Sequence, residues 1–575
     1  MYKSNKKHLQ PLLISNVNDL PEKHRCRLET SWSGVFYREF FCRLNEDAFA
    51  GMYAEVPSRP NIPVNVLVGL EALKAGFGWS DEELYDHYVF DVQVRYALGY
   101  RDLKEGDFEL RTLYNFRQRL SQYNQAKGVN LLVQAFENIT DQQMVALKVK
   151  SGIQRMDSTQ IASNILDMSR LQLLVEGLQR MWRVLKEEEQ QAYQEWLSKY
   201  VKAGSGQYVY RVKGQEATAA HTLEIGKAIQ RLLGETKANY ADTLAYQVMD
   251  RLFQENFNLV EEEVEVKPND QIGSGCLQSV DDLEATFRRK GPAEYKGYVA
   301  NLTQTCDEEN PIQLITKVQV APNNVDDATL LAEAASELKE RTGVETLYTD
   351  GVYGSPAADE QLNEYQIELI QTGIRGKAPA ADKLNLSQFE FTTTDKGKPV
   401  TITCPNGQQV PVEPGRSTGY IAPFDPQVCQ TCPFALAGNC RAKPGKSNPA
   451  FKLSFTQDEV NWARRRRRFE QSHQPGKNPR AAVEAVVRSV KHPFPAGKLP
   501  VRGLFRVTCM VIASAAMSNV RTIWRSQTVI NKIERPDKDK DVSCFLFSVK
   551  PFCFNLPYLG YKVQLFQESH SWMAE

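Results

Sequence analysis

Four consecutive segments decide the fold: KGYVANLTQTC (296–306), IQLITKVQVAP (312–322), VDDATLLAEAASELKERTG (325–343) and VETLYTDGVYG (344–354). The first two are rich in β-branched and apolar residues and predict strands. The third has apolar residues at helical spacing, and the fourth predicts a strand that ends at Asp350. Strands that alternate with helices in this order indicate an α/β sheet.

The alternation continues on both sides of this stretch. Downstream, the sequence predicts a helix over Pro356–Tyr365 and a strand over 367–373. Upstream, MVALKVKSGIQRMDST (144–159) has alternating apolar positions and predicts a strand that ends at Asp157. Because α/β sheets build their sites just past strand ends, Asp157 and Asp350 are candidates for one site. The alternative for either residue alone is a turn residue or a helix cap.

A strongly basic segment lies further along the chain. Residues 461–525 contain 14 Lys or Arg and two Glu, although the whole chain has 70 basic and 70 acidic residues. A positive charge this localised indicates a polyanionic partner, and a solvated basic helix is the alternative. Helical spacing over PRAAVEAVVRSVKH places four charged residues on roughly one face. They are Arg480, Glu484, Arg488 and Lys491.

Three carboxylates of this kind suit hard divalent cations. Two on adjacent strand ends and one on a nearby helix, here Glu484, offer the oxygen ligands that Mg²⁺ prefers and leave room for water and phosphate. Two such ions about 4 Å apart activate a water and stabilise the leaving oxygen of a phosphodiester. A glutamate among arginines on a helix is otherwise a surface ion pair.

Four of the eleven cysteines form a cluster. Cys429 and Cys432 have the C-x2-C spacing of zinc ligands, and with Cys404 and Cys440 they supply four sulfurs for a closed tetrahedral site. We expect a structural Zn²⁺ there, with metal-free cysteines as the alternative. No histidine lies within the cluster, so a catalytic zinc is not expected.

The region before the sheet is predicted to be helical. In 59–120, Ser80 and Glu83 form a capping-box pattern, followed by a helix that extends to Tyr96. A third helix is predicted over 110–120. Three short helices suit either a helix-turn-helix reader of DNA or a small structural or dimerisation bundle, and both alternatives remain open.

Hydropathy bounds the expected location. The longest apolar run, Val507–Met517, is too short to span a bilayer. The first residues are basic but lack the apolar core of a signal peptide, so we expect a cytoplasmic protein.

Taken together, the motifs resemble those of a transposase of a bacterial insertion sequence, of the DDE class with an RNase H-like catalytic core. MDSTQIASN (156–164) resembles the first-aspartate motif of that family, and TDGVY (349–353) resembles the second. The third region follows the family signature Tyr-x2-Arg-x3-Glu-x6-Lys. Arg480, Glu484 and Lys491 have the required spacings, and Lys477 stands at the tyrosine position.

The resemblance extends over roughly 60–525. The helical segment that ends in TLYNFRQRL (112–120) resembles the N-terminal domain of these transposases. The stretch LPVRGLFRVTCMVIASAAMSNVRTIWR (499–525) resembles their C-terminal helix.

The resemblance implies a set of roles. Asp157, Asp350 and Glu484 would be the catalytic metal ligands for Mg²⁺ or Mn²⁺, and Arg480 and Lys491 would position DNA phosphates. The enzyme would bind the terminal inverted repeats of double-stranded DNA as a homodimer, hydrolyse a strand at each end and transfer the freed 3′-hydroxyl to target DNA. A run of five arginines precedes the catalytic helix, and we predict that it contacts the DNA backbone. The five are Arg464, Arg465, Arg466, Arg467 and Arg468.

The expected organisation is an RNase H-like mixed sheet flanked by helices, with two insertions and an N-terminal all-α domain. The boundaries are 1–140 for a helical DNA-binding or dimerisation domain, 141–165, 270–373 and 456–525 for the catalytic core, 166–269 for a helical insertion, 374–455 for a Cys-rich β or irregular insertion, and 526–575 for a C-terminal tail of unassigned role. Two rival functions remain: a metal-dependent nuclease that does not join DNA, and an inactive DNA-binding protein.

Overall fold

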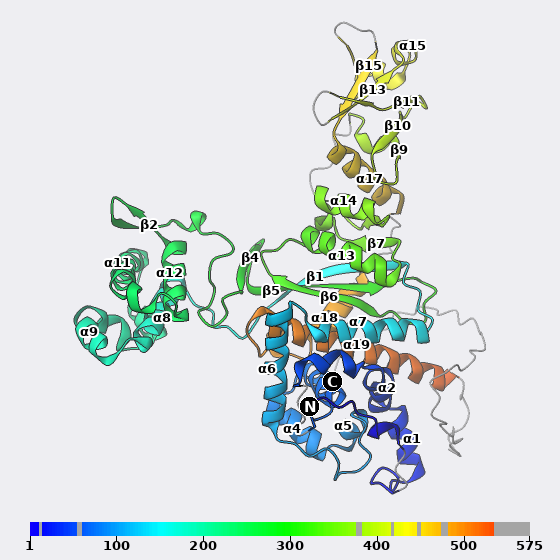
Figure 1. Ribbon diagram of the computed structural model, residues 1–575. Helices are drawn as coiled ribbons and strands as arrows, with labels where there is room; N and C mark the ends of the chain where they lie inside the picture. Colours follow the sequence, from blue (N-terminus) through cyan, green and yellow to red (C-terminus); the bar gives the residue numbers. More distant parts are fainter. Residues whose placement is uncertain are drawn as a thin grey trace.

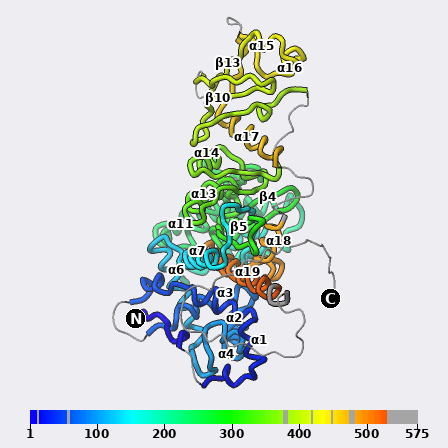
Figure 2. Tube along the Cα trace, turned by 90° about the vertical axis from the view of Figure 1, so that its right-hand side faces the viewer, coloured from blue at the N-terminus to red at the C-terminus, as the bar shows by residue number. Residues whose placement is uncertain are grey.

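The computed structural model describes residues 1–10, 14–54, 60–374, 382–415, 419–445, 450–472 and 481–533. A mixed sheet lies at the centre, with the N-terminal helices below it, a helical lobe to one side and a β-rich arm above (Figure 1). The view from the side shows the arm and the N-terminal helices at opposite ends of the molecule (Figure 2).

The central sheet confirms the predicted mixed α/β fold. Its strands follow the order β6-β5-β1-β7-β8, with β4 also paired to β5. β5 is antiparallel to β1, β4 and β6, whereas β7 is parallel to both β1 and β8. The strand bounds are β1 Ile153–Ile161, β4 Thr286–Lys290, β5 Ala293–Thr305, β6 Ile315–Pro322, β7 Thr346–Thr349 and β8 Glu368–Gln371.

Helices cover both faces of this sheet. α13 (Asp327–Thr342) and α14 (Pro356–Glu364) cover one face, where Met156 belongs to their apolar core. α7 (Leu131–Ala146), α18 (Ala481–Lys491) and α19 (Leu504–Ile533) cover the other face, below the sheet in Figure 1. Successive strand residues point to opposite faces, so Asp157 projects from the face opposite to that of Met156.

The N-terminal helices share the large apolar core that contains α19 and one face of the sheet. Ser80 and Glu83 form the predicted capping box of α4. The helix expected to extend to Tyr96 is interrupted instead at Asp91, whose carboxylate accepts two backbone N–H groups and begins a new helix. The bounds are α1 Glu22–Thr30, α2 Trp32–Glu39, α3 Val64–Phe77, α4 Asp81–Phe90, α5 Val92–Ala97 and α6 Leu110–Lys127.

Between β1 and β4 the chain forms the helical lobe, which has an apolar core of its own. Apolar residues at three- and four-residue spacing line the helix faces that meet inside it. A β2-β3 hairpin completes the lobe. The bounds are α8 Arg170–Val184, α9 Glu187–Val201, α10 Ser205–Arg211, α11 Gln215–Tyr240, α12 Leu244–Asn256, β2 Phe257–Val260 and β3 Glu263–Val266.

After β8 the chain enters the β-rich arm, whose short strands form two small sheets of order β11-β10-β9 and β12-β13-β15-β14. The arm returns to the central sheet through α17 (Gln457–Ser472), which contacts α14 and β8. The bounds are β9 Glu390–Thr393, β10 Pro399–Thr403, β11 Gln409–Pro411, β12 Glu413–Pro414, β13 Tyr420–Phe424, α15 Pro426–Gln430, α16 Pro433–Leu436, β14 Lys443–Pro444 and β15 Phe451–Phe455.

Two features differ from the sequence prediction. The segment 144–152 is not part of β1: α7 extends to Ala146, and β1 begins only at Ile153. β1 also continues past Asp157 to Ile161, so this aspartate lies inside the strand and not at its end. The antiparallel partner β5 explains the extension, because it pairs with β1 as far as Ile161. Among the residues that the structure describes, no helix is long and apolar enough to cross a membrane.

Candidate active site at the edge of β1 and β7

Strand register brings the two predicted aspartates together. The parallel pairing of β1 and β7 ends at Arg155 opposite Tyr348, and two further residues along each segment bring Asp157 level with Asp350. The Asp157 side chain is buried and accepts the Ser158 N–H at 3.0 Å. Asp350 follows the last residue of β7, and its carboxylate accepts the Val352 N–H at 2.9 Å. Asp350 therefore lies just past the end of β7, where α/β sheets build sites, whereas Asp157 lies within β1.

A buried tyrosine lies close to the same carboxylates. The Tyr353 hydroxyl is fully buried and donates a hydrogen bond to Asn301 Oδ1 at 2.8 Å. Burial raises the pKa of Tyr353 well above its ordinary value, and the negative charges of Asp327, Asp157 and Asp350 raise it further. All three carboxylates thus act on one phenol, which independently places Asp157 and Asp350 in one region.

Asp327 is an acidic residue of this region that the sequence did not single out. It lies in the first turn of α13, is 1% exposed, and neither carboxylate oxygen has a hydrogen-bond partner among the described residues. The Arg288 guanidinium lies 3.7 Å from one of the oxygens. The preceding Asp326 caps the helix by accepting the Thr329 N–H at 2.8 Å. The Asp-Asp pair before an apolar helix is a visible signal for a cap, but the burial of its second member is not visible in the sequence.

Glu484, the third predicted ligand, lies on the exposed side of α18. Val483 and Val490 on the same helix are buried, and the helix packs against β1 and α19. Lys491 ties its end to the sheet, because Nζ donates to the Gln160 carbonyl oxygen at 2.9 Å. Burial lowers the pKa of this lysine.

Two further positions of the third motif cannot be placed in this geometry. Arg480 and Lys477 lie outside the described residues. Lys491 therefore fixes the helix that carries Glu484 to the strand that carries Asp157, three residues beyond that aspartate. Its contact with phosphate stays a prediction.

The donor atoms at this edge suit a hard cation. Carboxylate oxygens are the ligands that Mg²⁺ and Mn²⁺ take, and two of the three predicted ligands are neighbours in the sheet. Within the described ranges, no group of three or more His, Cys, Asp or Glu side chains is gathered closely enough to hold a metal ion. The sheet thus supplies two neighbouring carboxylates, and α18, which carries Glu484, packs against β1.

The five arginines of α17 are half-buried and have protein partners. They attach α17 to α14, β8 and the arm, and their contact with DNA stays a prediction. The partners are Asn363 for Arg464 (3.4 Å), Asp359 for Arg465, Glu470 for Arg466 (2.8 Å), Glu390 for Arg467 (3.4 Å) and Glu368 for Arg468 (2.9 Å).

The four predicted zinc cysteines all lie in the arm. Cys404 follows β10, Cys429 belongs to α15, Cys432 precedes α16, and Cys440 comes shortly after α16. All four are free thiols. Cys404 and Cys440 pack against the apolar core that contains Cys429, and Cys432 lies in the same turn as Cys429.

A family comparison covers the last part of this geometry. Residues 403–524 match the family described as "Transposase DDE domain". The match includes the four cysteines, α17, α18 with Glu484 and most of α19. It begins after Asp157 and Asp350 and includes neither of them. The chain is thus similar to the DDE-class transposases, and the match supports a transposase function. No curated protein and no solved structure matches the chain.

Proposed function

We propose that the chain is the transposase of a bacterial insertion sequence. It binds the terminal inverted repeats of its element, cleaves a DNA strand at each end and transfers the freed 3′-hydroxyl to target DNA. The parallel register of β1 and β7, whose continuation brings Asp157 level with Asp350, is the observation that supports this proposal most directly. The match of residues 403–524 to a transposase DDE domain supports it from the other end of the chain.

The topology supports an RNase H-like core. Strands β6, β5 and β1 form an antiparallel half, and β7 and β8 continue parallel to β1 after helices α13 and α14. The helical lobe between β1 and β4 and the arm between β8 and α17 are then two insertions into this core. Because both leave and re-enter beside the sheet, they lengthen the chain between the carboxylates without disturbing the register.

The residues divide the chemistry among themselves. Asp157 and Asp350 hold divalent metal from the sheet, and Glu484 closes the site from α18. Bound Mg²⁺ or Mn²⁺ supplies an activated water and stabilises the charge on the leaving oxygen. Lys491 and Arg480 position DNA phosphates, which needs only basic side chains at the backbone. A serine or tyrosine nucleophile is not required, since no covalent protein–DNA intermediate forms.

The segment 461–525 gives the DNA-binding surface its positive charge. The five arginines of α17 contribute to this DNA-binding surface where DNA phosphates displace or share their acidic protein partners. Two ends must be held at once, so the active form is a homodimer, and we place its action in the cytoplasm.

The decisive experiment is cleavage of a duplex that carries the element's own terminal repeat, with Mg²⁺ or Mn²⁺. Wild type should nick at the repeat end, and Asp157→Ala, Asp350→Ala and Glu484→Ala should each bind the duplex without cutting it. Asp307→Ala and Glu340→Ala are matched controls, because these exposed or loop carboxylates lie away from the edge and should leave cleavage unchanged.

The outcomes separate the proposal from its rivals. Pre-cut ends joined to a target plasmid support a transposase, whereas cleavage without joining identifies a nuclease. Binding without cleavage by wild type identifies an inactive DNA-binding protein. Normal cleavage by Glu484→Ala alone would show that the third ligand is another residue.

A further inference from the structure

The tip of the β10-β11 hairpin carries the first of four cysteines that converge in the arm. The Cys404 N–H donates to the Gln408 carbonyl oxygen at 2.9 Å, and the Gly407 N–H returns to the Cys404 carbonyl oxygen at 2.9 Å. Gly407 has a φ of +84°, which glycine adopts without strain. This tight turn fixes the direction in which Cys404 leaves the hairpin.

The second and third cysteines lie against this turn. Cys429 Sγ is 3.9 Å from the Gln408 side-chain oxygen, so α15 contacts the turn that carries Cys404. The Cys432 N–H donates to the Cys429 carbonyl oxygen at 3.3 Å, which makes the two residues of the C-x2-C pair the ends of one turn. Both cysteines are buried.

The fourth cysteine returns to the same place through α16. The Cys440 N–H donates to the Phe434 carbonyl oxygen at 3.1 Å, which folds the chain back over the short helix. Cys404 and Cys440 are partly buried, and both pack against the apolar core of the arm that contains the buried Cys429.

We propose that Cys404, Cys429, Cys432 and Cys440 bind one structural Zn²⁺ that clips the β10-β11 hairpin to α15 and α16. Four sulfurs on two tight turns form a closed tetrahedral set, with no open position for catalysis. As the side chains stand, no three ligating groups of the described residues are close enough to hold an ion. Binding therefore requires the thiols to rotate inward, and each loses its proton to the solvent as the thiolate joins the metal.

The architecture of the arm gives the zinc a task. β12 and β14 contain two residues each, and β11 contains three, so the arm has few ladder hydrogen bonds of its own. Small units often gain stability from a disulfide or a structural metal. The proposal does not depend on the proposed function, because the cysteines lie in the arm, apart from the β1/β7 edge (Figure 1).

The test is the metal content of the full chain, purified with a reductant and without chelator. Wild type should contain about one zinc per chain, as a single four-sulfur site requires. The double variant Cys404→Ser/Cys432→Ser should lose it. Cys276→Ser and Cys509→Ser should keep it, because these two cysteines lie outside the arm.

A second measurement needs no variant. Zinc is stripped from wild type with a chelator and replaced by Co²⁺, whose visible absorption distinguishes tetrahedral thiolate ligation from other sites. Strong thiolate-to-cobalt bands, together with faster proteolysis of the stripped arm than of the zinc form, support the proposal. Wild type without zinc and without these cobalt bands overturns it, and so does zinc that persists in the double variant.

Discussion

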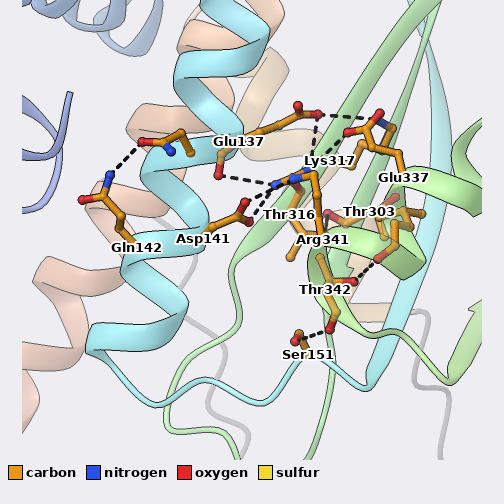
Figure 3. A network of polar contacts seen from close by, with 12 residues as sticks. Glu137, Asp141, Gln142, Ser151, Thr303, Thr316, Lys317, Glu337, Arg341 and Thr342 are labelled. Carbon is orange, nitrogen blue, oxygen red and sulfur yellow. Dashed lines mark hydrogen bonds and ion pairs between the residues drawn. The ribbon is translucent and has the colours of Figure 1, made fainter. Parts of the chain in front are cut away.

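Two acidic regions lie on different strands of the central sheet, one on the outer strand β6 and one at the inner strands β1 and β7, and they differ in the charges that surround them. In the first region, Glu137, Asp141 and Glu337 surround Lys317 and Arg341, which link α7, β6 and α13 (Figure 3). The Arg341 guanidinium lies 2.8 Å from Asp141 and 3.2 Å from Glu137. We call these five residues the Glu137 network.

In the second region, the charged groups that act most strongly on the buried Tyr353 are all carboxylates: Asp327, Asp157 and Asp350. The Glu137 network brings its own cations and stabilises the packing of α7 against the sheet. The region of β1 and β7 instead places three carboxylates around one buried phenol. The comparison separates an acidic cluster whose carboxylates pair with two cations of the fold from one whose carboxylates surround a buried tyrosine.

The largest expected effect is at the edge of β1 and β7. Asp350→Asn keeps a side-chain oxygen for the Val352 N–H, because asparagine caps as well as aspartate does. It should lower DNA cleavage by more than ~100-fold, since losing even an outer partner of a metal ligand costs 10–100-fold. Thermal unfolding should show no loss of stability. An unfolded variant, or one that cleaves normally, would contradict a functional role for this edge.

A substitution in the Glu137 network should instead lower the stability of the fold. Arg341→Met removes one of the two cations of the network, and should lower the free energy of unfolding by up to about 3–5 kcal/mol because the largely buried Glu137, 13% exposed, loses a partner. Denaturant unfolding measures the effect. Arg183→Met is the matched control: its side chain is 62% exposed and its pair with Glu176 spans 3.6 Å, so its loss should cost about 0–1 kcal/mol. Equal losses in the two variants would erase the distinction between buried and exposed pairs.

A smaller effect is expected at Lys491, which holds α18 in place and thereby positions Glu484. Lys491→Met releases the end of α18 from the Gln160 carbonyl oxygen and should reduce cleavage by roughly 10-fold through misplacement of Glu484. The Mg²⁺ concentration needed for half-maximal cleavage should rise, which a purely structural loss would not cause. Lys491→Arg should restore part of the activity. If the Met variant binds DNA poorly and the Arg variant binds it normally, Lys491 acts on phosphate and not on the helix.

Sequence patterns predicted the sheet because its strands and helices alternate clearly from residue 296 to 373, and they located Asp350 correctly after β7. They misplaced the start and end of β1. The alternation in 144–152 is equally compatible with the end of a helix, and the extension to Ile161 depends on pairing with a strand more than 130 residues away. Such partners have no local signal.

The contacts between side chains that are distant in the sequence were the least predictable part of the structure. The arginine run of α17 suggests an exposed basic surface, but acidic residues from α14, β8 and the arm meet it in the fold. Asp327 shows the same limit, since its burial follows from the packing of α13 on the sheet. The C-x2-C spacing, by contrast, has a local signal: it predicts one turn for Cys429 and Cys432, and the Cys432 N–H donates to the Cys429 carbonyl oxygen across that turn, whereas a site of all four cysteines stays a prediction.

The smallest predicted effect is a pH dependence within the Glu137 network. Burial raises the pKa of Glu137 to about 7, against the lowering effect of Lys317 and Arg341. Between its ordinary value of 4.5 and 7, the folded state then holds more protons than the unfolded state, so the free energy of unfolding falls as pH rises. Glu337, whose pKa is lowered, loses its contribution only as pH falls below the same ordinary value.

Glu137→Gln isolates this contribution because it cannot titrate. Wild type should lose stability from pH 5 to pH 7 relative to the variant, with a slope of at most about 1.4 kcal/mol per pH unit for one proton. Denaturant unfolding at several pH values measures the slope, and the exposed Glu340→Gln is the control that should leave it unchanged. A wild-type slope identical to that of Glu137→Gln would mean that Glu137 stays ionised across this range. The Glu137 network would then hold three ionised carboxylates and two cations. The fold would tolerate a surplus negative charge there, as it does around Tyr353.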